Sequence, residues 1–314
     1  MSVLLTGAGG QIGSALRRLC PPALDLLSLY RRPCPDTDTG SGVAGAHSMV
    51  MDLADVNAIS TLLQQHRFDV IINAAAWTAV DAAEQQPQAA WQLNAELPAL
   101  LAARAREQDS LLLHYSTDYV HDGSQKTNHL EDAEPAPLNV YGRSKLAGDR
   151  AIQASGCRHL ILRTSWVYGG SGSNFLDTIA ARLMSAQPLR VVDDQIGCPT
   201  WSEDIARCSW QALDAALVQP AFNAGLYHLS GADAMSWYDF AVEIQATLAA
   251  AGVLPPASSL SACGSDDYAQ AAQRPSRVVL DSSAFRQRFG ARPEGRAAIR
   301  RATLHWLSAW QQCA

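Results

Sequence analysis

The sequence predicts an α/β fold built on a doubly wound parallel sheet, and three observations carry this prediction. Short apolar runs alternate with helical patterns over residues 1–165, as they do in strand–helix repeats. These runs show little polar–apolar alternation, which is typical of strands buried on both faces of a parallel sheet. A glycine-rich turn separates the first run from the first helical pattern. Beyond residue 166 the rhythm is less regular, which predicts a smaller C-terminal domain.

The expected elements follow one another in a simple order. The expected strands are Val3–Leu5, Leu26–Tyr30, Val70–Ile72, Leu111–Leu113 and His159–Arg163. The expected helices are Ile12–Leu19, a stretch from about Asp55, Leu97–Glu107, Ser144–Ala154, Phe175–Met184, Ser202–Ala216, Ser236–Ala251 and Arg296–Gln311. Segment Pro33–Ser48, rich in Gly, Ser, Asp and Thr, is expected to be a surface loop, and Pro255–Asp267 shows no clear periodicity.

Composition indicates a globular cytoplasmic enzyme. The 314 residues are 48% apolar and 17% charged, so the chain has enough material for a core. The formal charge of −6 and the absence of a basic stripe argue against nucleic acid as a partner. No apolar stretch of about 20 residues predicts a membrane span, and the first residues do not resemble a signal peptide. Seven scattered cysteines without a CxxC pair predict neither a disulfide framework nor a metal site.

The segment Thr6–Gly13 carries the first motif. Gly7, Gly10 and Gly13 have the spacing GxxGxxG between a predicted strand and a predicted helix. Glycine lets the backbone turn sharply and approach a pyrophosphate, and the helix that follows points its positive end at the phosphate. An ordinary glycine turn is the alternative. The position at the first strand–helix junction favours dinucleotide binding in a Rossmann-type domain over residues 1–165, with 166–314 mainly a substrate-binding domain from which some segments return.

The end of the second predicted strand indicates which dinucleotide binds. An acidic residue at this place would bond the ribose 2′-hydroxyl of NAD. The chain instead has Arg31 and Arg32, and guanidinium groups bind phosphate well. This favours NADPH over NADH, with two solvated arginines at the start of a loop as the alternative.

A Tyr–Lys pair provides the candidate catalytic group. Tyr141 and Lys145 are separated by one helical turn and would share a face. With eight tyrosines and only two lysines in the chain, this spacing seldom arises by chance. The Lys145 ammonium would lower the pKa of the Tyr141 phenol and let it exchange a proton. A surface pair on a helix is the alternative.

Hydroxyl groups end the strand that precedes this helix. Ser116, Thr117 and Asp118 follow the buried run Leu111–Leu113, and ligands of open α/β sheets bind beyond the carboxyl ends of strands. Ser116 or Thr117 is therefore placed to bond a substrate oxygen beside Tyr141. Simple capping of the strand end is the alternative.

Taken together, these motifs resemble the extended short-chain dehydrogenase/reductases, and more closely the dTDP-4-dehydrorhamnose reductases among them. The segments that carry the closer resemblance are Asn73–Asp81, Tyr115–Val120, Pro137–Gly142, Arg163–Tyr168, Asp194–Thr200 and Gly225–Leu229. The resemblance implies that dTDP-4-dehydro-L-rhamnose is reduced at its 4-keto group to dTDP-L-rhamnose with NADPH, or with NADH.

The resemblance also implies a role for individual residues. Tyr141 matches the general acid, Lys145 its activator and ribose anchor, and Thr117 the third member of the triad. Asp118 and Trp166 match contacts to the sugar nucleotide. The cofactor contacts implied by the turn, the second strand and the resemblance are Gly7, Gly10, Gln11, Ile12, Gly13, Arg31, Asp52, Leu53, Ala75, Ala76, Trp77, Tyr115, Tyr141 and Lys145. Some relatives dimerise through Mg²⁺, for which no ligands can be assigned here, so a monomer or a homodimer is expected.

The residue after Asp118 distinguishes reduction from dehydration among enzymes of this fold. Related dehydratases carry Asp-Glu after the triad hydroxyl, whereas this chain has Asp118-Tyr119. A phenol with a pKa near 10 is a poor substitute for a carboxylate base, so reduction is favoured over dehydration. A nucleotide-sugar epimerase and a catalytically silent NADP-binding regulatory subunit are the remaining alternatives.

Overall fold

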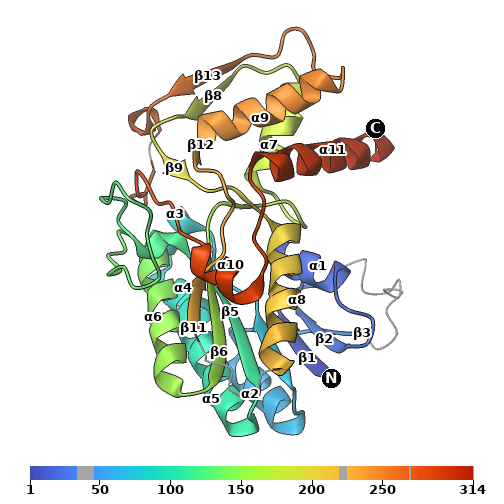
Figure 1. Cartoon of the computed structure of the whole chain (residues 1–314), viewed down its shortest axis with the longest axis vertical. Helices are drawn as coiled ribbons and strands as arrows, with labels where there is room; N and C mark the ends of the chain where they lie inside the picture. Colours follow the sequence, from blue (N-terminus) through green and yellow to red (C-terminus); the bar gives the residue numbers. More distant parts are fainter. Residues whose placement is uncertain (34–45, 219–224, 269, 314) are drawn as a thin grey trace.

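A parallel seven-stranded sheet forms the centre of the molecule in the described residues, which are 1–33, 46–218, 225–268 and 270–313 of the computed structural model (Figure 1). The strand order is β11-β6-β5-β4-β1-β2-β3. The strands are β1 (Ser2–Thr6), β2 (Asp25–Tyr30), β3 (Ala46–Val50), β4 (Val70–Asn73), β5 (Leu111–Thr117), β6 (Arg158–Thr164) and β11 (Gly225–His228). The α/β prediction is confirmed.

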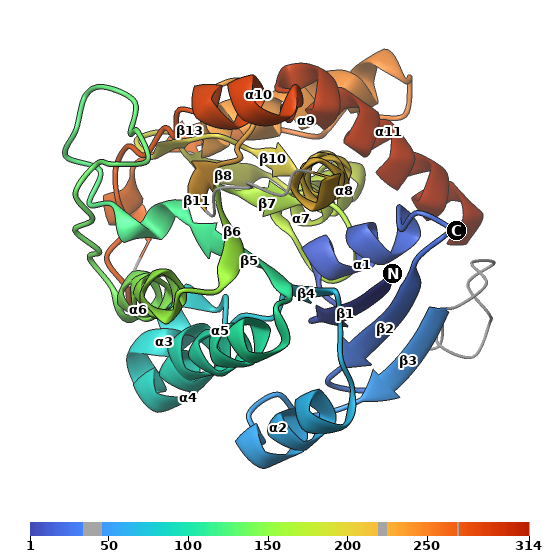
Figure 2. The same ribbon diagram turned by 60° about the horizontal axis from the view of Figure 1, so that its bottom comes forward.

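Helices cover both faces of this sheet (Figure 2). One face packs against α1 and α8, the other against α2 and α5, and each face has its own apolar core. The helices and helical turns are α1 (Gln11–Arg18), α2 (Val56–Gln65), α3 (Val80–Gln85), α4 (Pro87–Trp91), η2 (Gln92–Glu96), α5 (Leu97–Gln108), η3 (Asp118–Val120), α6 (Val140–Ser155), α7 (Phe175–Met184), α8 (Ser202–Val218), α9 (Trp237–Ala250), η4 (Ser265–Asp267), α10 (Ser283–Phe289) and α11 (Arg296–Cys313).

The order of strands creates a crevice at one edge of the sheet. From β1 the chain runs outward through β2 and β3, then returns to β4 on the other side of β1. Ligands of doubly wound sheets bind at this switch point, beyond the carboxyl ends of the strands. The register aligns Thr6 with Asn73 and Asn73 with His114, so three polar residues form one row across β1, β4 and β5.

The second half of the chain builds a smaller layer above that edge (Figure 1). Helices α7, α9 and α11 share a third apolar core with the short strands β7 (Val167–Tyr168), β8 (Leu189–Val192), β10 (Thr200–Trp201) and β12 (Met235–Ser236). Strand β8 pairs with β13 (Leu260–Cys263), and β12 pairs with β9 (Ile196–Gly197). This half also returns to the large sheet, because β11 pairs with β6 and α8 packs on α1.

Two sequence-based expectations need correction. Most of the expected loop Pro33–Ser48 lies outside the described residues, but its end is wrong, because β3 begins at Ala46 and pairs with β2. Segment Pro255–Asp267 contains β13, which was not expected because its four residues lack a periodic pattern. In the described part of the chain, no helix combines the length and apolarity needed to cross a membrane.

Candidate active site

The glycine turn joins β1 to α1 at the switch point. The Gly10 N–H donates to the Gly7 carbonyl over 3.0 Å, and α1 begins at the next residue, Gln11. Gly7 has φ +69°, and a Cβ there would lie 2.6 Å from the Ala75 nitrogen. Only glycine fits this position without strain, because the conformation and the close approach to β4 both exclude a side chain.

A cavity of about 620 Å³ opens beside this turn. Its lining includes eight of the predicted cofactor contacts, which are Gly7, Gly10, Arg31, Asp52, Leu53, Ala75, Ala76 and Trp77. It also includes Arg32, which the sequence analysis grouped with Arg31, and residues that were not predicted, namely Gly9, Tyr30, Pro33, Ala74, Thr78, Ala79 and Leu93. The cavity runs from the end of β1 to the two arginines at the end of β2, as an extended dinucleotide requires.

The other predicted cofactor contacts lie outside this lining. Ile12 and Gly13 belong to α1, where Ile12 packs against the core. The Tyr115 hydroxyl donates to the Ser209 hydroxyl of α8 over 2.7 Å or accepts from it, so the phenol ring lies in the core below the sheet edge. The buried Gln11 Oε1 has no hydrogen-bond partner in the described part of the chain.

Tyr141 and Thr117 meet at the carboxyl end of β5. The Thr117 side chain lies beside the Tyr141 phenol and lowers its pKa, against the larger effect of burial. Trp77 of the cavity packs in the same small apolar cluster as Tyr141. Asn139 caps α6 by accepting from the Gly142 N–H over 2.8 Å, which fixes the first turn that carries Tyr141. These contacts place a phenol and a hydroxyl together beside the cavity.

The ionisable groups of this cluster are buried, and burial sets their pKa values. Burial raises the pKa of Tyr141 above its ordinary value, which is opposite to the direction expected from Lys145. Removal of the phenolate from water is the main cause, and the Asp118 carboxylate acts in the same direction. The Lys145 ammonium donates to the Tyr115 carbonyl over 2.6 Å. Burial also lowers the pKa of Lys145 to about 8, while the Asp149 carboxylate opposes this shift.

Asp118 supports Thr117 from behind. Its two carboxylate oxygens accept from the Thr117 hydroxyl over 3.1 Å and from the Ser165 hydroxyl over 2.8 Å. Burial raises the pKa of this carboxyl to about 6, and the two hydroxyl donors oppose the shift. Because both oxygens are engaged within the protein, Asp118 fixes the direction of the Thr117 side chain.

Trp166 lies at the junction between the two layers. Its φ is +45°, which is uncommon for a bulky residue. On the neighbouring wall, Arg274 forms an ion pair with Asp81 at 2.7 Å and also bonds the Tyr119 phenol. The segment around Arg274 is thereby held over η3 at the rim of the site.

Several residues of the site were not found by sequence reasoning. His114 contacts Lys145 Nζ through its Nε2 over 3.1 Å. Asn94 is fully buried and joins Trp77 of the cavity to Ser144 of α6 through three hydrogen bonds. Neither residue belongs to a motif, and both act through partners far away in the sequence. In the described residues, no group of three or more His, Cys, Asp or Glu side chains could hold a metal ion.

A doubly wound sheet with a glycine turn at its switch point and a Tyr–Lys pair at the adjoining strand edge defines an extended short-chain dehydrogenase/reductase, a class of NAD(P)-dependent oxidoreductases. Comparison with known proteins narrows this class. The family described as RmlD substrate binding domain matches residues 1–306. A curated dTDP-4-dehydrorhamnose reductase from Shigella flexneri is 38% identical, and the match covers 92% of this chain and 92% of the relative. The enzyme of the same name from Burkholderia thailandensis is 35% identical, and the match covers 95% of this chain and 97% of the relative.

Solved structures agree with these relatives. A crystal structure of a dTDP-4-dehydrorhamnose reductase from Clostridium acetobutylicum is 28% identical, covers 99% of this chain and 100% of its own, and has a TM-score of 0.79. The Bacillus anthracis reductase in complex with NADP is 26% identical, covers 98% and 99% of the two chains, and has a TM-score of 0.80. The chain therefore belongs to the family of dTDP-4-dehydrorhamnose reductases.

Proposed function

We propose that this protein reduces the 4-keto group of dTDP-4-dehydro-L-rhamnose with NADPH and releases dTDP-L-rhamnose. The observation that carries the proposal is the proximity of the Tyr141 phenol and the Thr117 side chain at the end of β5, next to the cavity that begins at Gly7. A phenol and a hydroxyl that converge on one point can hold a carbonyl oxygen. Family membership over nearly the whole chain supports the same substrate.

The residues around the cavity suit NADPH. Backbone N–H groups at the start of α1 can bond the pyrophosphate, and the buried, unpartnered Gln11 Oε1 is an acceptor available near this turn. Arg31 and Arg32 provide guanidinium groups for a 2′-phosphate at the far end of the cavity. When bound, NADPH supplies the hydride that reduces the carbonyl carbon.

The chain's own residues handle the proton and the carbonyl oxygen. We assign Tyr141 as the general acid that donates its phenolic proton to the oxygen. Thr117, whose single hydroxyl proton is donated to Asp118 in the free protein, turns that proton to the substrate oxygen when the substrate binds. Burial raises the pKa of Tyr141, so the phenol is fully protonated and ready to act as an acid at neutral pH. The positive charge of Lys145, one helical turn away, stabilises the phenolate that forms.

The substrate side is formed by Asp118, Trp166 and the wall around Tyr119. Asp118 acts through Thr117, whose hydroxyl it orients, and Trp166 lies at the junction between the two layers, where it is assigned a contact to the sugar nucleotide. No carboxylate stands in the place of Tyr119, whose pKa burial raises to about 12. A group that remains protonated cannot serve as the base that dehydration needs, and this supports reduction without loss of water.

One assay separates this reaction from its alternatives. Purified protein is incubated with NADPH and dTDP-4-dehydro-L-rhamnose, and both NADPH absorbance and the sugar product are followed. Loss of NADPH in a one-to-one ratio with dTDP-L-rhamnose supports the reductase. A changed sugar without net loss of NADPH would indicate an epimerase, and NADPH binding without any product would indicate a regulatory subunit.

The expected setting of the enzyme is part of the same proposal. With a net charge of −6, the protein is proposed to act in the cytoplasm without a nucleic-acid or membrane partner. Residues 1–165 supply most of the NADP site and residues 166–314 most of the substrate site. A monomer or a homodimer is expected, and light scattering on the purified protein distinguishes them.

A further inference from the structure

The side chain of Lys145 is almost completely buried. The residue is 2% exposed, and Nζ lies 2.6 Å from the Tyr115 carbonyl oxygen and 3.1 Å from His114 Nε2. The titratable and charged groups that face it are Tyr141 and Asp149 from α6, His114 from β5, and Arg163 from β6 through its ion pair with Asp149. Of these, His114 is the one whose ring nitrogen lies within hydrogen-bond distance.

His114 is a neutral imidazole in this position. It is fully buried, and burial together with the charge of Lys145 lowers its pKa well below the ordinary value. A neutral imidazole has one N–H donor and one nitrogen acceptor, and the two can exchange places by a change of tautomer. The hydrogen bonds on its two sides therefore decide which nitrogen carries the proton.

The row of residues across the sheet specifies one arrangement. The Thr6 hydroxyl donates to Asn73 Oδ1 over 2.7 Å, which turns Asn73 Nδ2 toward His114 Nδ1 at 3.0 Å. With Nδ1 accepting, the ring proton lies on Nε2 and points at Lys145 Nζ. This arrangement is fully satisfied when Lys145 is a neutral amine, since an amine nitrogen can accept while it still donates to Tyr115.

The same residues can satisfy the charged form of Lys145. A half-turn of the Asn73 amide presents Oδ1 to His114, whose proton then lies on Nδ1, and leaves Nε2 free to accept from the ammonium. The Thr6 hydroxyl then accepts from Asn73 Nδ2 and donates to the Ile72 carbonyl, which lies 3.5 Å away. No backbone movement is needed for this exchange, because all three residues lie in register on adjacent strands.

We propose that His114 is a positioning residue for Lys145. The tautomer of the His114 ring changes with the charge of the Lys145 ε-amino group, so that the buried nitrogen stays hydrogen-bonded in both of its charge states. The inference rests on the proposed function, in which Tyr141 loses a proton in each turnover. Lys145 passes a proton to the Tyr141 phenolate, becomes a neutral amine, and regains a proton from solvent. A hydrogen-bond partner that could only accept would favour the charged form of Lys145, and one that could only donate would favour the neutral form. Either partner would therefore oppose one of the two proton transfers at Lys145.

Asp149 cannot provide the same switch. Its Oδ2 accepts from the Ser116 hydroxyl over 2.8 Å and lies 3.3 Å from Arg163 Nε. Its Oδ1 lies 3.9 Å from His114 Nε2, beyond hydrogen-bond distance, so His114 Nε2 has Lys145 Nζ as its nearer partner. Asp149 raises the pKa of Lys145 and thus favours only the charged form. The combination of a carboxylate behind and a switching imidazole beside Lys145 suits an amine whose pKa burial has lowered to about 8.

The experiment uses the fact that the whole sequence has only two lysines. Lysine labelled with ¹³C at Cε gives one signal for Lys145 and one for the exposed Lys126, which serves as an internal reference. In the wild-type protein, ¹⁵N shifts of the His114 ring should pass from the Nδ1–H to the Nε2–H tautomer as Lys145 loses its proton with rising pH. A His114 tautomer that stays constant through the Lys145 titration would overturn the proposal.

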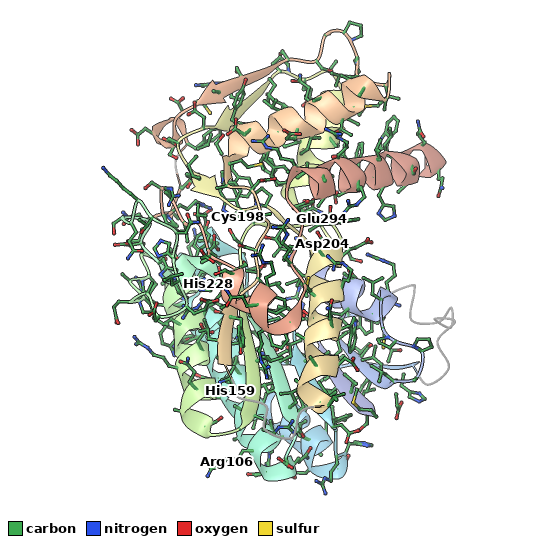
Figure 3. The ribbon with its side chains drawn as sticks, in the orientation of Figure 1. Arg106, His159, Cys198, Asp204, His228 and Glu294 are labelled. Atoms are coloured by element: carbon green, nitrogen blue, oxygen red, sulfur yellow. The ribbon has the colours of Figure 1, made fainter. Side chains whose placement is uncertain are left out.

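Variants provide the second arm. His114→Leu should lower the titration midpoint of Lys145 by about one pH unit or more, because the ammonium loses its acceptor. His114→Gln, whose amide can present either an oxygen or an NH₂ group, should keep the midpoint close to that of the wild type. The matched control is His159→Leu, which removes a buried strand histidine near the opposite end of β6 (Figure 3).

Turnover then connects the switch to the reaction. The alkaline limb of the kcat–pH profile should move to lower pH in His114→Leu by the same amount as the Lys145 signal, with no such move in His159→Leu. If the enzyme is active but the titration midpoint of Lys145 is the same in His114→Leu as in the wild type, this inference is overturned. A wild-type protein that shows the tautomer change but consumes no NADPH with the sugar nucleotide instead contradicts the proposed function.

Discussion

The indole rings of Trp166 and Trp237 are stacked, with centroids 3.6 Å apart and planes 4° from parallel. Gly197 also touches the Trp166 ring so closely that a Cβ there would come within 2.3 Å of it. Trp166 is thus held between the first turn of α9 and strand β9. This support explains how a bulky residue keeps a φ of +45°, a conformation that costs about 1–3 kcal/mol when unsupported.

Removal of the stack should weaken binding of the sugar nucleotide. Trp237→Leu frees Trp166 to leave its strained conformation, and the KM for dTDP-4-dehydro-L-rhamnose is expected to rise about 3- to 10-fold, as for the loss of one aromatic pair. Trp237→Phe should retain most of the affinity. Steady-state kinetics with each substrate varied will measure this, with the KM for NADPH unchanged. Trp310→Leu on the exposed face of α11 is the control, and an equal rise there would refute the stacking argument.

Tyr141→Phe tests the proposed general acid. The substitution removes only the hydroxyl, so we expect turnover to fall at least about 100-fold while the affinity for NADPH stays nearly unchanged. Stopped-flow turnover and fluorescence titration with NADPH report the two quantities separately. Tyr227→Phe removes a hydroxyl from a ring that packs on Phe285 and Phe289, away from the site, and should keep full activity. Wild-type turnover in Tyr141→Phe would remove this residue from the mechanism.

Arg31→Asp tests the choice of cofactor. The carboxylate would repel a 2′-phosphate and could bond a free 2′-hydroxyl, so the KM for NADPH should rise about tenfold or more. The KM for NADH should fall or stay constant, which makes the second cofactor an internal control for folding. Equal changes with both cofactors would show that Arg31 does not contact the 2′-phosphate.

Buried histidines should make the protein unstable in acid. His121 and His228 are buried, and burial lowers the pKa of each to about 3, with the charge of Arg163 acting in the same direction. Both side chains are neutral in the folded state but become protonated in the unfolded state below their ordinary pKa of 6.5. Their contribution to stability is therefore complete above that pH and is lost as the pH falls from 6.5 toward about 3, by about 1.4 kcal/mol per pH unit for each residue.

Urea unfolding at about pH 7.5 and about pH 5.5 will measure this loss. His121→Phe, which keeps a ring stacked against His129, should reduce the difference between the two free energies of unfolding. His66→Phe replaces an exposed histidine and should leave the difference unchanged. An unchanged difference in His121→Phe would mean that His121 does not contribute to it.

The sequence predicts the helices and strands of the molecule better than the contacts between side chains that are far apart in the sequence. Buried apolar runs, the turn at Gly7 and the spacing of Tyr141 and Lys145 are local signals, and the expected strands and helices are present within a few residues of their predicted ends. Strand β13 was missed because four residues in an edge pair need no regular pattern. The direction of the pKa shift at Tyr141 was wrong because it depends on burial, which the spacing of two residues does not reveal.

The role of His114 could not be predicted for a related reason. In the sequence it is one polar residue in an apolar strand, and its partners Asn73 and Lys145 are 41 and 31 residues away. Only the pairing of β4 with β5 and the packing of α6 bring these groups together. The same holds for Trp166 and Trp237, whose contact joins the segment after β6 to the start of α9.

The pairing of β11 with β6 has a consequence for folding during synthesis on the ribosome. Until residues 225–228 have been synthesised, β6 remains an edge strand with unpaired backbone groups. Such an edge can pair with a strand of another chain and lead to aggregation. Helix α8, whose Trp210 indole donates to the Leu16 carbonyl over 3.1 Å, must also emerge before the first helix is covered. The nascent nucleotide-binding half therefore keeps an open sheet edge until nearly three quarters of the chain, up to residue 228 of 314, has been synthesised.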